Sequence, residues 1–410
     1  MSGPGAGGEA NGDAKGPLEG LRVVEMGTML AGPLCARLLA DYGADVVKIE
    51  DPKRGDIGRD WGRHKLEGKS LWWPIQGRNK RCVTINLREP EGQELARQLC
   101  DRADILVENF RPGTLERWGL GPERLAESNP GLVVARVSGF GQSGPAREKA
   151  GFGVVGEAVG GLRYTTGYPD QAPPRVGVSI GDEIASLFAV IGVLLALQSR
   201  QRSGRGQVVD VAIYEAVFAM MESIVTEYAR VGGLPERTGS RLPGVAPSNV
   251  YPTADEEWVI IAANAENVFR RLMAVLGQPE LADDPRFVDH ASRAANYEVL
   301  DETIGSWSSQ RSGDEIIAML DEAGVPASKI YSPADMLEDP HFWAREMLVE
   351  TTDRVLGELT IPGIVPKLSA TPGAIRWLGA DHGEHNEEVF EQELGLATER
   401  LEELREKGIV

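Results

Sequence analysis

One acidic residue stands at the start of the longest apolar segment of this sequence. Asp182 follows residues 178–181 and precedes the run 184–197, which consists only of apolar and small residues. Such a run is typical of a buried helix, and a carboxylate in its first turn faces the positive end of the helix dipole. The dipole favours the ionised carboxylate, which is the form that attacks a thioester as a nucleophile.

Asp182 also has an ordinary structural explanation, because aspartate is a preferred N-cap residue. Its position alone therefore assigns no catalytic role. Residues 151–156 match the dinucleotide-binding pattern Gly-x-Gly-x-x-Gly, but they follow a polar loop at 142–149. The pattern belongs in the turn between the first strand of a domain and its helix. Close packing between helices explains these glycines as well as a nucleotide does.

The composition limits the class of protein. With 410 residues the chain can bury a sizeable core and form two domains. It carries 43 Lys and Arg against 62 Asp and Glu, a net charge of -19, which argues against nucleic acid or an anionic membrane as a partner. A small anionic ligand is still compatible with local basic residues. The three cysteines form no disulfide framework, so we expect a reduced, cytoplasmic setting.

Metal, export and membrane signals are weak. His382 and His385 lie three residues apart beside acidic residues, but no third ligand is evident, so we predict a solvated loop and no metal site. Residues 1–16 are rich in Gly and Ala and lack the apolar core of a signal peptide, so we expect a disordered leader. The run 184–197 is shorter than the ~20 residues that span a bilayer.

The first third of the chain alternates strand and helix patterns. Near-continuous apolar strands of this kind predict a parallel sheet of the doubly wound type, covered by helices on both faces. The apolar runs lie at 21–26, 45–49, 83–87, 105–107 and 132–135, and the helical patterns at about 31–42, 89–101 and 114–127.

The rest of the chain predicts further elements and a second, smaller unit. A Gly/Pro-rich stretch at 232–248 indicates a boundary. Beyond it, a strand at 258–263 and several helical patterns are typical of a small α/β domain. The other predicted elements are a strand at 208–211, helices at about 215–231, 266–276, 296–310 and 313–323, an extended hairpin at 348–363 and a terminal helix at 384–406.

Several short motifs are specific in combination, although each alone is weak. In their order and spacing the chain resembles the class III CoA-transferase family, also called the CaiB–BaiF family, from residue 17 to residue 410. The motifs are PLEGLRVVE at 17–25, LAGP at 30–33, DYGADVVKIE at 41–50, RNKR at 78–81, VENFRPG at 107–113, SGFGQSGP at 138–145 and GD at 181–182.

The resemblance implies an α/β fold with a Rossmann-like large domain, built around a parallel sheet, and a smaller α/β domain. It also implies that two subunits interlock as a homodimer. We expect the first part of the large, CoA-binding domain at 17–213, a linker helix and the small domain at 214–329, and the return to the large domain at 330–410.

The resemblance places the catalytic aspartate on Asp182, and the residue type fits the chemistry. The carboxylate attacks the donor thioester, which produces a mixed aspartyl-acyl anhydride and free CoA thiolate. The thiolate then attacks the aspartyl carbonyl, which releases the donor's carboxylate and leaves an aspartyl-CoA thioester. The acceptor carboxylate attacks this thioester, and the reverse sequence yields the acceptor's CoA ester and the free aspartate. Backbone amides of nearby glycine loops would stabilise the oxyanions. Each anhydride is already activated, so we expect CoA as a co-substrate and no permanently bound cofactor.

The family pattern also implies the residues that bind CoA. Phe110 would stack on adenine, and Arg88 and Arg117 would meet phosphates. Every one of these positions also has a plain explanation, as a core residue, a tight packing site or a surface charge. The expected CoA-binding residues are Leu30, Ala31, Ile85, Arg88, Asn109, Phe110, Arg117 and Lys149, with Arg147 beside the last.

Two departures from related enzymes narrow the reaction. α-Methylacyl-CoA racemases use a histidine as base where this chain has Phe152, which has no titratable group, so a racemase is the alternative reading. Enzymes that act on oxalate carry a glutamine at the position of Leu30 and a run of glycines where this chain has 239–245. We therefore expect CoA transfer from succinyl-CoA to another short dicarboxylate or hydroxy acid, with Arg241 or Arg175 pairing the distal carboxylate.

Two other classes remain as alternatives. A CoA-binding protein without activity is one, although the intact Gly-Asp pair at 181–182 argues against it. A nicotinamide-dependent oxidoreductase is the other, and it depends only on the glycine pattern at 151–156.

Overall fold

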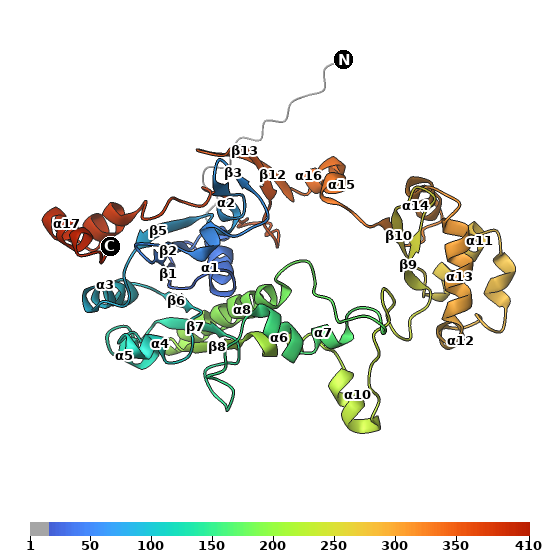
Figure 1. Ribbon diagram of the computed structural model, residues 1–410, viewed down its shortest axis with the longest axis horizontal. Coiled ribbons are helices and arrows are strands. Elements are labelled where there is room, and N and C mark those ends of the chain that lie inside the picture. The colour runs from blue at the N-terminus through green and yellow to red at the C-terminus, as the bar shows by residue number, and fades with distance from the viewer. Residues whose placement is uncertain (1–15) are drawn as a thin grey trace, which may run out of the picture. The chain divides into compact units, whose positions relative to one another are not determined.

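The computed structural model describes residues 16–410 (Figure 1), so the predicted leader at 1–16 lies outside the described residues except for Gly16. The chain forms two compact units. The larger contains the described residues up to Leu162, Val176–Val225 and His341–Val410, and the smaller contains Arg163–Arg175 and Thr226–Pro340. Each is described by itself.

A six-stranded parallel sheet forms the centre of the larger unit, as the sequence predicted. In space its strands follow the order β5-β2-β1-β6-β7-β8, so the direction of winding reverses between β1 and β6. In doubly wound sheets the ligand lies outside the carboxyl ends of the strands at this reversal. The strands are β1 (Arg22–Glu25), β2 (Asp45–Glu50), β5 (Lys80–Thr84), β6 (Ile105–Glu108), β7 (Val133–Ser138) and β8 (Val208–Ala212).

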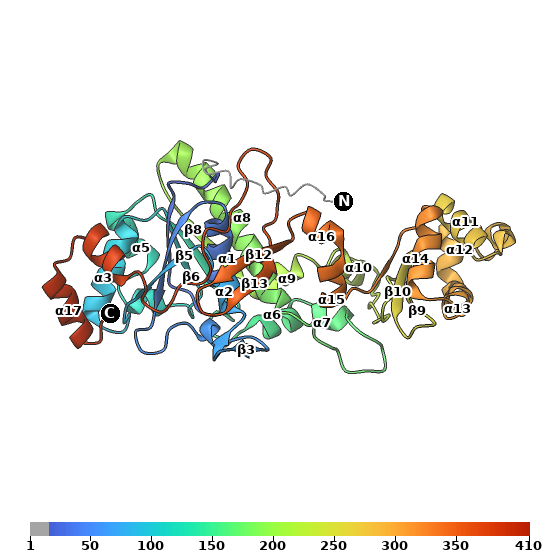
Figure 2. The same ribbon diagram turned by 90° about the horizontal axis from the view of Figure 1, so that it is seen from above.

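Alternate residues of the strands enter two separate cores. Val24, Val47 and Leu106 lie in one core, and their neighbours in β1, β2 and β6 lie in the other. Helices α3 (Pro90–Asp101), α5 (Pro122–Ser128) and α17 (Thr398–Glu406) cover the first face. Helices α1 (Ala31–Asp41) and α8 (Ile180–Ser203) cover the second, and the two views show α3 and α17 on the opposite side of the sheet from α1 and α8 (Figure 1, Figure 2). Both faces are buried, which explains why the strands are almost continuously apolar.

The predicted apolar helix is longer than its apolar run. Among residues 16–410, α8 alone is long and apolar enough to cross a membrane by length and composition. Its small residues Ala185, Ala189, Val193 and Ala196 are nevertheless fully buried in the second core, which identifies α8 as a core helix of the larger unit.

Three segments were predicted to form one helix each, and this is wrong because each contains two separate elements. The segment 114–127 contains α4 (Thr114–Arg117) and α5, separated at Gly119, whose φ of 67° a helix cannot continue. The segment 215–231 splits into α9 (Ile213–Phe218) and α10 (Ile224–Val231). The terminal segment forms a π-helical turn, η3 (Glu388–Glu393), and then α17, with Gly395 between them at φ 78°.

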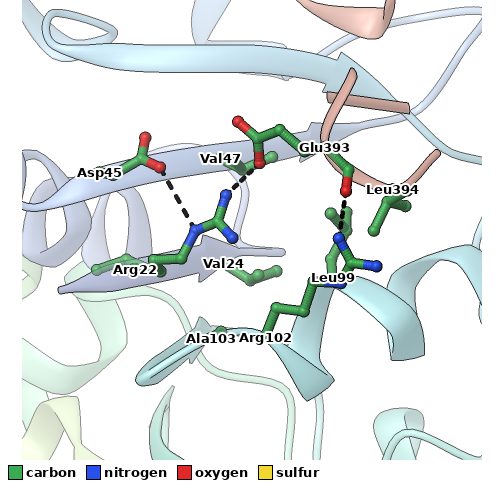
Figure 3. Close-up of a pocket in the computed structure, with 10 residues that line it drawn as sticks. Arg22, Val24, Asp45, Val47, Leu99, Arg102, Ala103, Glu393 and Leu394 are labelled. Carbon is green, nitrogen blue, oxygen red and sulfur yellow. Dashed lines mark hydrogen bonds and ion pairs between the residues drawn. The ribbon is translucent and has the colours of Figure 1, made fainter. Parts of the chain in front are cut away.

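The terminal segment is attached to the amino edge of the sheet. Arg22 at the start of β1 pairs with Glu393 and lies 3.7 Å from Asp45. Arg102 donates to the carbonyl oxygen of Glu393 (Figure 3). The small cavity between these side chains, about 20 Å³, lies at the edge opposite to the carboxyl ends of the strands.

The remaining elements of the larger unit are short. The predicted hairpin is confirmed as β12 (Leu348–Asp353) paired antiparallel with β13 (Gly357–Pro362). The others are η1 (Ile57–Arg59), β3 (Lys65–Leu66), β4 (Lys69–Ser70), α2 (Trp73–Gln76) and α6 (Gly153–Val159), with α7 (Leu162–Thr165) and α16 (Pro340–Ala344) at the unit boundaries.

The smaller unit has its own apolar core between a three-stranded antiparallel sheet and several helices. Tyr251, Val259 and Ile261 of the sheet pack against Phe269 and Leu300 of the helices. Its elements are β9 (Ser248–Pro252), β10 (Trp258–Ala262), α11 (Glu266–Val275), η2 (Pro279–Asp283), α12 (His290–Ala295), α13 (Tyr297–Ser308), α14 (Gly313–Glu322), β11 (Ala327–Lys329) and α15 (Pro333–Glu338).

Candidate active site

A cavity of about 110 Å³ lies where the winding of the sheet reverses. Ile85, Arg88 and Phe110, three of the predicted CoA-binding residues, line it. The ring of Phe110 meets that of Trp118 edge-on, with 5.1 Å between centroids. The other lining residues are Met26, Gly27, Thr28, Ile49, Glu50, Asp51, Gly55, Asp56, Leu87 and Trp118. The cavity therefore combines an aromatic wall with a basic side chain at the place where doubly wound folds bind ligands.

The family pattern pointed to the loop 108–110 for CoA, but sequence reasoning gave no role to the Glu108 carboxylate, which holds the aromatic wall. Glu108 is buried at the end of β6, and its carboxylate accepts hydrogen bonds from the backbone N–H of Phe110 at 2.7 Å and from Arg136 Nε at 2.6 Å. Burial raises the pKa of Glu108 to about 6, although Arg136 opposes the shift. The adjacent positions in the VENF motif were the only signal in the sequence.

Arg88 is an exposed side chain with a carboxylate partner. Its guanidinium lies 2.8 Å from Asp51 Oδ2, and Asp51 also lines the cavity. Burial favours the neutral carboxyl, but hydrogen bonds from Arg88 and from two backbone N–H groups lower the pKa of Asp51 below its usual value. The pair leaves Arg88 with further donors that face solvent, so an anionic group at the cavity mouth can still bind it.

Asn109 contacts protein backbone. Its Oδ1 accepts from the N–H of Thr28 and its Nδ2 donates to the carbonyl of Thr28, both at 2.9 Å. An added Cβ on Gly27 or Gly32 would come within 3.0 or 3.3 Å of the Asn109 side chain. The small residues of this segment therefore make room for Asn109, which ties the ends of β1 and β6 together.

Asp182 lies in the first turn of α8, as predicted, and is half-buried. Its carboxylate also lies against the first residue of α6, because a Cβ added to Gly153 would stand 2.1 Å from Asp182 Oδ2. A Cβ on Gly181 would meet the carbonyl oxygen of Gly153 at 2.9 Å. Two glycines thus let the amino-terminal ends of α6 and α8 approach around one carboxylate.

The glycine pattern at 151–156 therefore serves packing. Gly151 lies against the backbone of Gly139, Gly153 against Asp182, and Gly156 against Ile213 of α9. This explains the pattern without a dinucleotide and removes the only observation that favoured an oxidoreductase.

A buried hydroxyl connects Asp182 with the first residue of α1. Ser186 Oγ lies 2.7 Å from the carbonyl oxygen of Asp182 and 2.7 Å from that of Ala31. Leu30 and Ala31 are both buried, at the start of α1. Ser186 was not predicted, and only its position one turn after Asp182 pointed to it.

The other predicted residues lie elsewhere. Arg117 is exposed on α4 and donates to Thr114 at 3.0 Å, and Lys149 is exposed in the loop before α6. Arg241 belongs to the smaller unit, where it stacks on the ring of Tyr297 at 3.5 Å, and Arg175 belongs to the same unit. The roles of these four residues stay predictions.

The two histidines make structural contacts. His382 Nε2 lies 3.0 Å from the carbonyl oxygen of Asp51, and His385 Nδ1 lies 3.2 Å from the backbone N–H of Cys82. Across residues 16–410, no group of three or more His, Cys, Asp or Glu side chains is placed to hold a metal ion. The cysteines are free and buried, and burial raises the pKa of Cys35 to about 12.

Comparison with known proteins identifies the family. Residues 18–386 match the model of CoA-transferase family III. A succinyl-CoA–D-citramalate CoA-transferase of Chloroflexus aurantiacus is 53% identical, with 96% of this chain and 98% of that protein covered. The beta subunit of a succinyl-CoA–L-malate CoA-transferase from the same organism is 41% identical, again with 96% and 98% covered. A crystal structure of a CaiB/BaiF family protein from Brucella suis, 34% identical, superimposes with a TM-score of 0.82 over 92% of this chain and 99% of that one.

The chain therefore belongs to CoA-transferase family III, the CaiB/BaiF family. It is a CoA-transferase, with coenzyme A as co-substrate, as the sequence motifs predicted. The racemase reading is not supported by these relatives.

Proposed function

We propose that this CoA-transferase moves CoA from succinyl-CoA to a short hydroxydicarboxylate of the citramalate or malate type, through covalent intermediates on Asp182. The observation that carries the assignment of Asp182 is its carboxylate, half-buried at the meeting point of two helix amino termini. The donor and acceptor classes are supported by the relatives that are 53% and 41% identical, which use succinyl-CoA with D-citramalate and L-malate.

The two helix ends suit both the nucleophile and the transition state. The positive ends of α6 and α8 favour the ionised carboxylate of Asp182. When the thiolate attacks the aspartyl carbonyl, negative charge develops on the same oxygen atoms, and the fixed dipoles oppose that charge without reorganisation. Gly153 leaves the space that the carboxylate occupies, so the arrangement is set before substrate binds.

CoA would occupy the cavity at the reversal point of the sheet. The aromatic ring of Phe110 would pack against adenine, and the guanidinium of Arg88 would bind a phosphate. The segment 27–33 begins at this cavity, and the carbonyl of its Ala31 accepts a hydrogen bond from Ser186 of α8. The pantetheine arm would follow this segment from the nucleotide to Asp182.

The assembly we propose is the interlocked homodimer of the predicted type, in the cytoplasm. The support is an apolar surface on the larger unit: Leu187, Ile191 and Leu195 of α8 are each more than half exposed. Phe152 at the start of α6 is 74% exposed. Surfaces of this kind are typical of subunit interfaces.

The experiment is a substrate panel with a matched pair of variants. The enzyme is incubated with succinyl-CoA and with D-citramalate, L-malate, glutarate or oxalate, and new CoA esters are measured by mass spectrometry. Hydroxylamine added during turnover should leave a hydroxamate on the peptide that carries Asp182. We expect Asp182→Asn to abolish both signals, whereas Glu183→Gln, at the next position of the same helix turn, keeps them. A fully active Asp182→Asn would refute the proposal.

A further inference from the structure

Four buried charges lie directly beneath the segment that joins the CoA cavity to Asp182. Lys48 Nζ contacts Glu25 Oε1 and Asp56 Oδ2, both at 2.6 Å, and Lys80 Nζ contacts Glu25 Oε2 at 2.7 Å. All four side chains are at most 1% exposed. Burial favours the neutral amine, but Asp56 and Glu25 raise the pKa of Lys48, while burial lowers the pKa of Lys80. The four residues are called the charge cluster below.

A buried cluster of this kind is a poor way to stabilise a fold. Desolvating each charge costs several kcal/mol, and well-packed apolar residues often do as well or better. The larger unit already has two apolar cores around its sheet. The role of the charge cluster is therefore sought in the contacts that the Lys48 and Lys80 ammonium groups make outside it.

Those contacts are carbonyl groups at the two ends of the segment 27–33. Lys48 Nζ donates to the carbonyl of Gly27 at 3.0 Å, and Lys80 Nζ donates to the carbonyl of Pro33 at 2.7 Å. Lys48 thus binds both carboxylates of the cluster and one end of the segment, and Lys80 binds Glu25 and the other end. A charged donor makes a stronger hydrogen bond than a neutral one.

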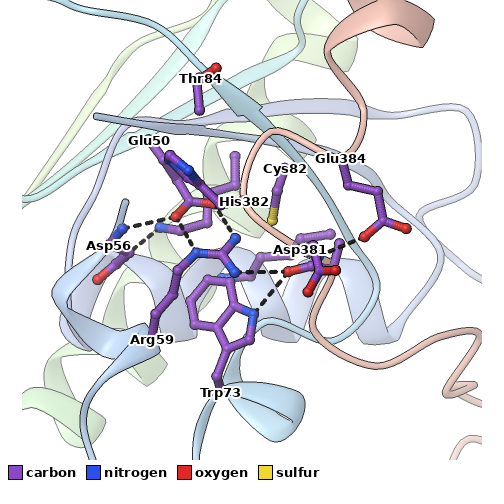
Figure 4. A network of polar contacts seen from close by, with 12 residues as sticks. Glu50, Asp56, Arg59, Trp73, Cys82, Thr84, Asp381, His382 and Glu384 are labelled. Carbon is purple, nitrogen blue, oxygen red and sulfur yellow. Dashed lines mark hydrogen bonds and ion pairs between the residues drawn. The ribbon is translucent and has the colours of Figure 1, made fainter. Parts of the chain in front are cut away.

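The middle of the segment is held from the same side. Asp56 Oδ1 accepts a hydrogen bond from the backbone N–H of Met29 at 2.9 Å. The φ of Met29 is 66°, a backbone angle that residues other than glycine rarely adopt. Asp56 is itself fixed by the N–H of Gly58 at 2.7 Å, and its own N–H donates to Glu50, which Arg59 binds (Figure 4). A backbone conformation of this kind persists only where its surroundings enforce it.

The segment in turn sets the geometry of the reaction. Its first two residues line the cavity, and its carbonyl at Ala31 lies 2.7 Å from Ser186 Oγ, which is equally close to the carbonyl of Asp182. A shift of the segment would change how far the thiol end of CoA reaches from its nucleotide end.

We propose that Lys48 and Lys80 are positioning residues for CoA transfer, which hold the segment 27–33 at its two ends so that bound CoA and Asp182 are in register. This inference depends on the proposed function of Asp182. The two lysines divide the work. Lys48 holds the end at the cavity and therefore governs CoA binding, whereas Lys80 holds the end near α8 and governs the chemical steps.

Two charge-neutral double variants test the division. Glu25→Gln with Lys80→Met leaves the Lys48–Asp56 pair intact and should lower kcat at least tenfold, towards the 10²-fold that a misplacement of about 1 Å costs, with little change in the KM for CoA. Lys48→Met with Asp56→Asn leaves Lys80 as the sole cation of the cluster, beside Glu25, and should raise the KM for CoA at least tenfold with a smaller change in kcat.

A third double variant is the matched control. Arg78 and Asp41 form another buried ion pair in the larger unit, 2% and 1% exposed, at the far end of α1 from the segment. Asp41→Asn with Arg78→Met removes equal charge without touching residues 27–33. It should alter the unfolding transition while kcat and KM per folded molecule stay within about twofold.

Hydrogen exchange provides a readout that does not depend on turnover. In the native enzyme, peptides covering 27–34 should exchange slowly, and both cluster variants should exchange there at least tenfold faster while the control does not. Fast exchange in the native enzyme would overturn the proposal even if a variant fails to fold. So would cluster variants whose kcat and KM match those of the control. If instead the native enzyme transfers no CoA, the proposed function fails, and exchange still reports whether the cluster holds the segment.

Discussion

Replacing Gly153 by alanine tests the geometry around Asp182 directly. The added Cβ would stand 2.1 Å from Asp182 Oδ2, whereas an ordinary contact begins at 3.4 Å. The φ of Gly153 is not in the left-handed region, so alanine fits the backbone, and the carboxylate must move by more than about 1 Å. Because the carboxylate ends a flexible side chain, we expect it to rotate away while the fold stays intact.

The expected loss of activity follows from that displacement. A misplacement of about 1 Å costs on the order of 10²-fold in rate, equivalent to about 2.7 kcal/mol of barrier. Alanine also has the better helix propensity by up to about 1 kcal/mol, so the free energy of unfolding should change little or rise. The assays are steady-state CoA transfer, hydroxamate trapping on the Asp182 peptide, and urea unfolding.

Gly156→Ala is the matched control in the same helix. Its Cβ would stand 2.5 Å from Ile213 Cγ2, in a packed contact that does not involve the carboxylate. Overpacking of this kind costs about 1–3 kcal/mol of stability, but kcat per folded molecule should be unchanged. A Gly153→Ala enzyme that transfers CoA within threefold of the native rate would refute the reasoning. So would one that loses activity only because it unfolds.

The remaining predictions concern binding, pH and stability. Arg88→Ala should raise the KM for CoA about tenfold with kcat nearly unchanged, measured by steady-state kinetics. The pKa of Glu108 is raised to about 6, so its carboxyl gains a proton as the pH falls through 6. Protonation weakens its contact to the N–H of Phe110, and the KM for CoA should therefore rise below pH 6. The Glu108→Gln variant should lack this pH dependence. Asp41→Ala leaves the buried Arg78 unpaired and should cost about 3–5 kcal/mol in urea unfolding.

The Arg88 prediction has a control and an outcome that would contradict it. Arg97→Ala removes a surface arginine with a carboxylate partner on α3 and should leave the KM for CoA unchanged, so an equal rise in both variants would contradict a specific role for Arg88. The sign of the pH effect on stability is opposite to the effect on binding. A carboxyl whose pKa is raised in the folded state destabilises the fold when ionised, and this cost is relieved as the pH falls from about 6 towards the unfolded value of about 4.3.

The doubly wound sheet was predictable because its cause is local. Each strand reads as an apolar run and each helix as a 3.6-residue pattern, and the right-handed connection then leaves few arrangements. The helix breaks at Gly119 and Gly395 were harder to predict, because a single glycine is tolerated in a helix when tertiary contacts support it. The domain ranges 17–213, 214–329 and 330–410 stay predictions.

The motif residues were predictable as a set, but their individual roles were not. Asn109 and Phe110 are adjacent in one motif, yet Phe110 lines the cavity while Asn109 binds the backbone of Thr28. Side chains at the end of a strand point in alternate directions, and only the neighbouring chain decides what each one meets.

Residue types and spacing were enough to indicate a parallel α/β enzyme with a carboxylate at a helix start. Only the tertiary structure placed Gly153 so close to that carboxylate that an added Cβ would lie 2.1 Å from Asp182 Oδ2. It also brought the charge cluster, Glu25, Lys48, Asp56 and Lys80, together beneath the segment 27–33. Local patterns show how each segment forms its backbone hydrogen bonds and which of its side chains it buries. Contacts between residues far apart in the chain depend on how the completed elements pack, and no local pattern contains that information.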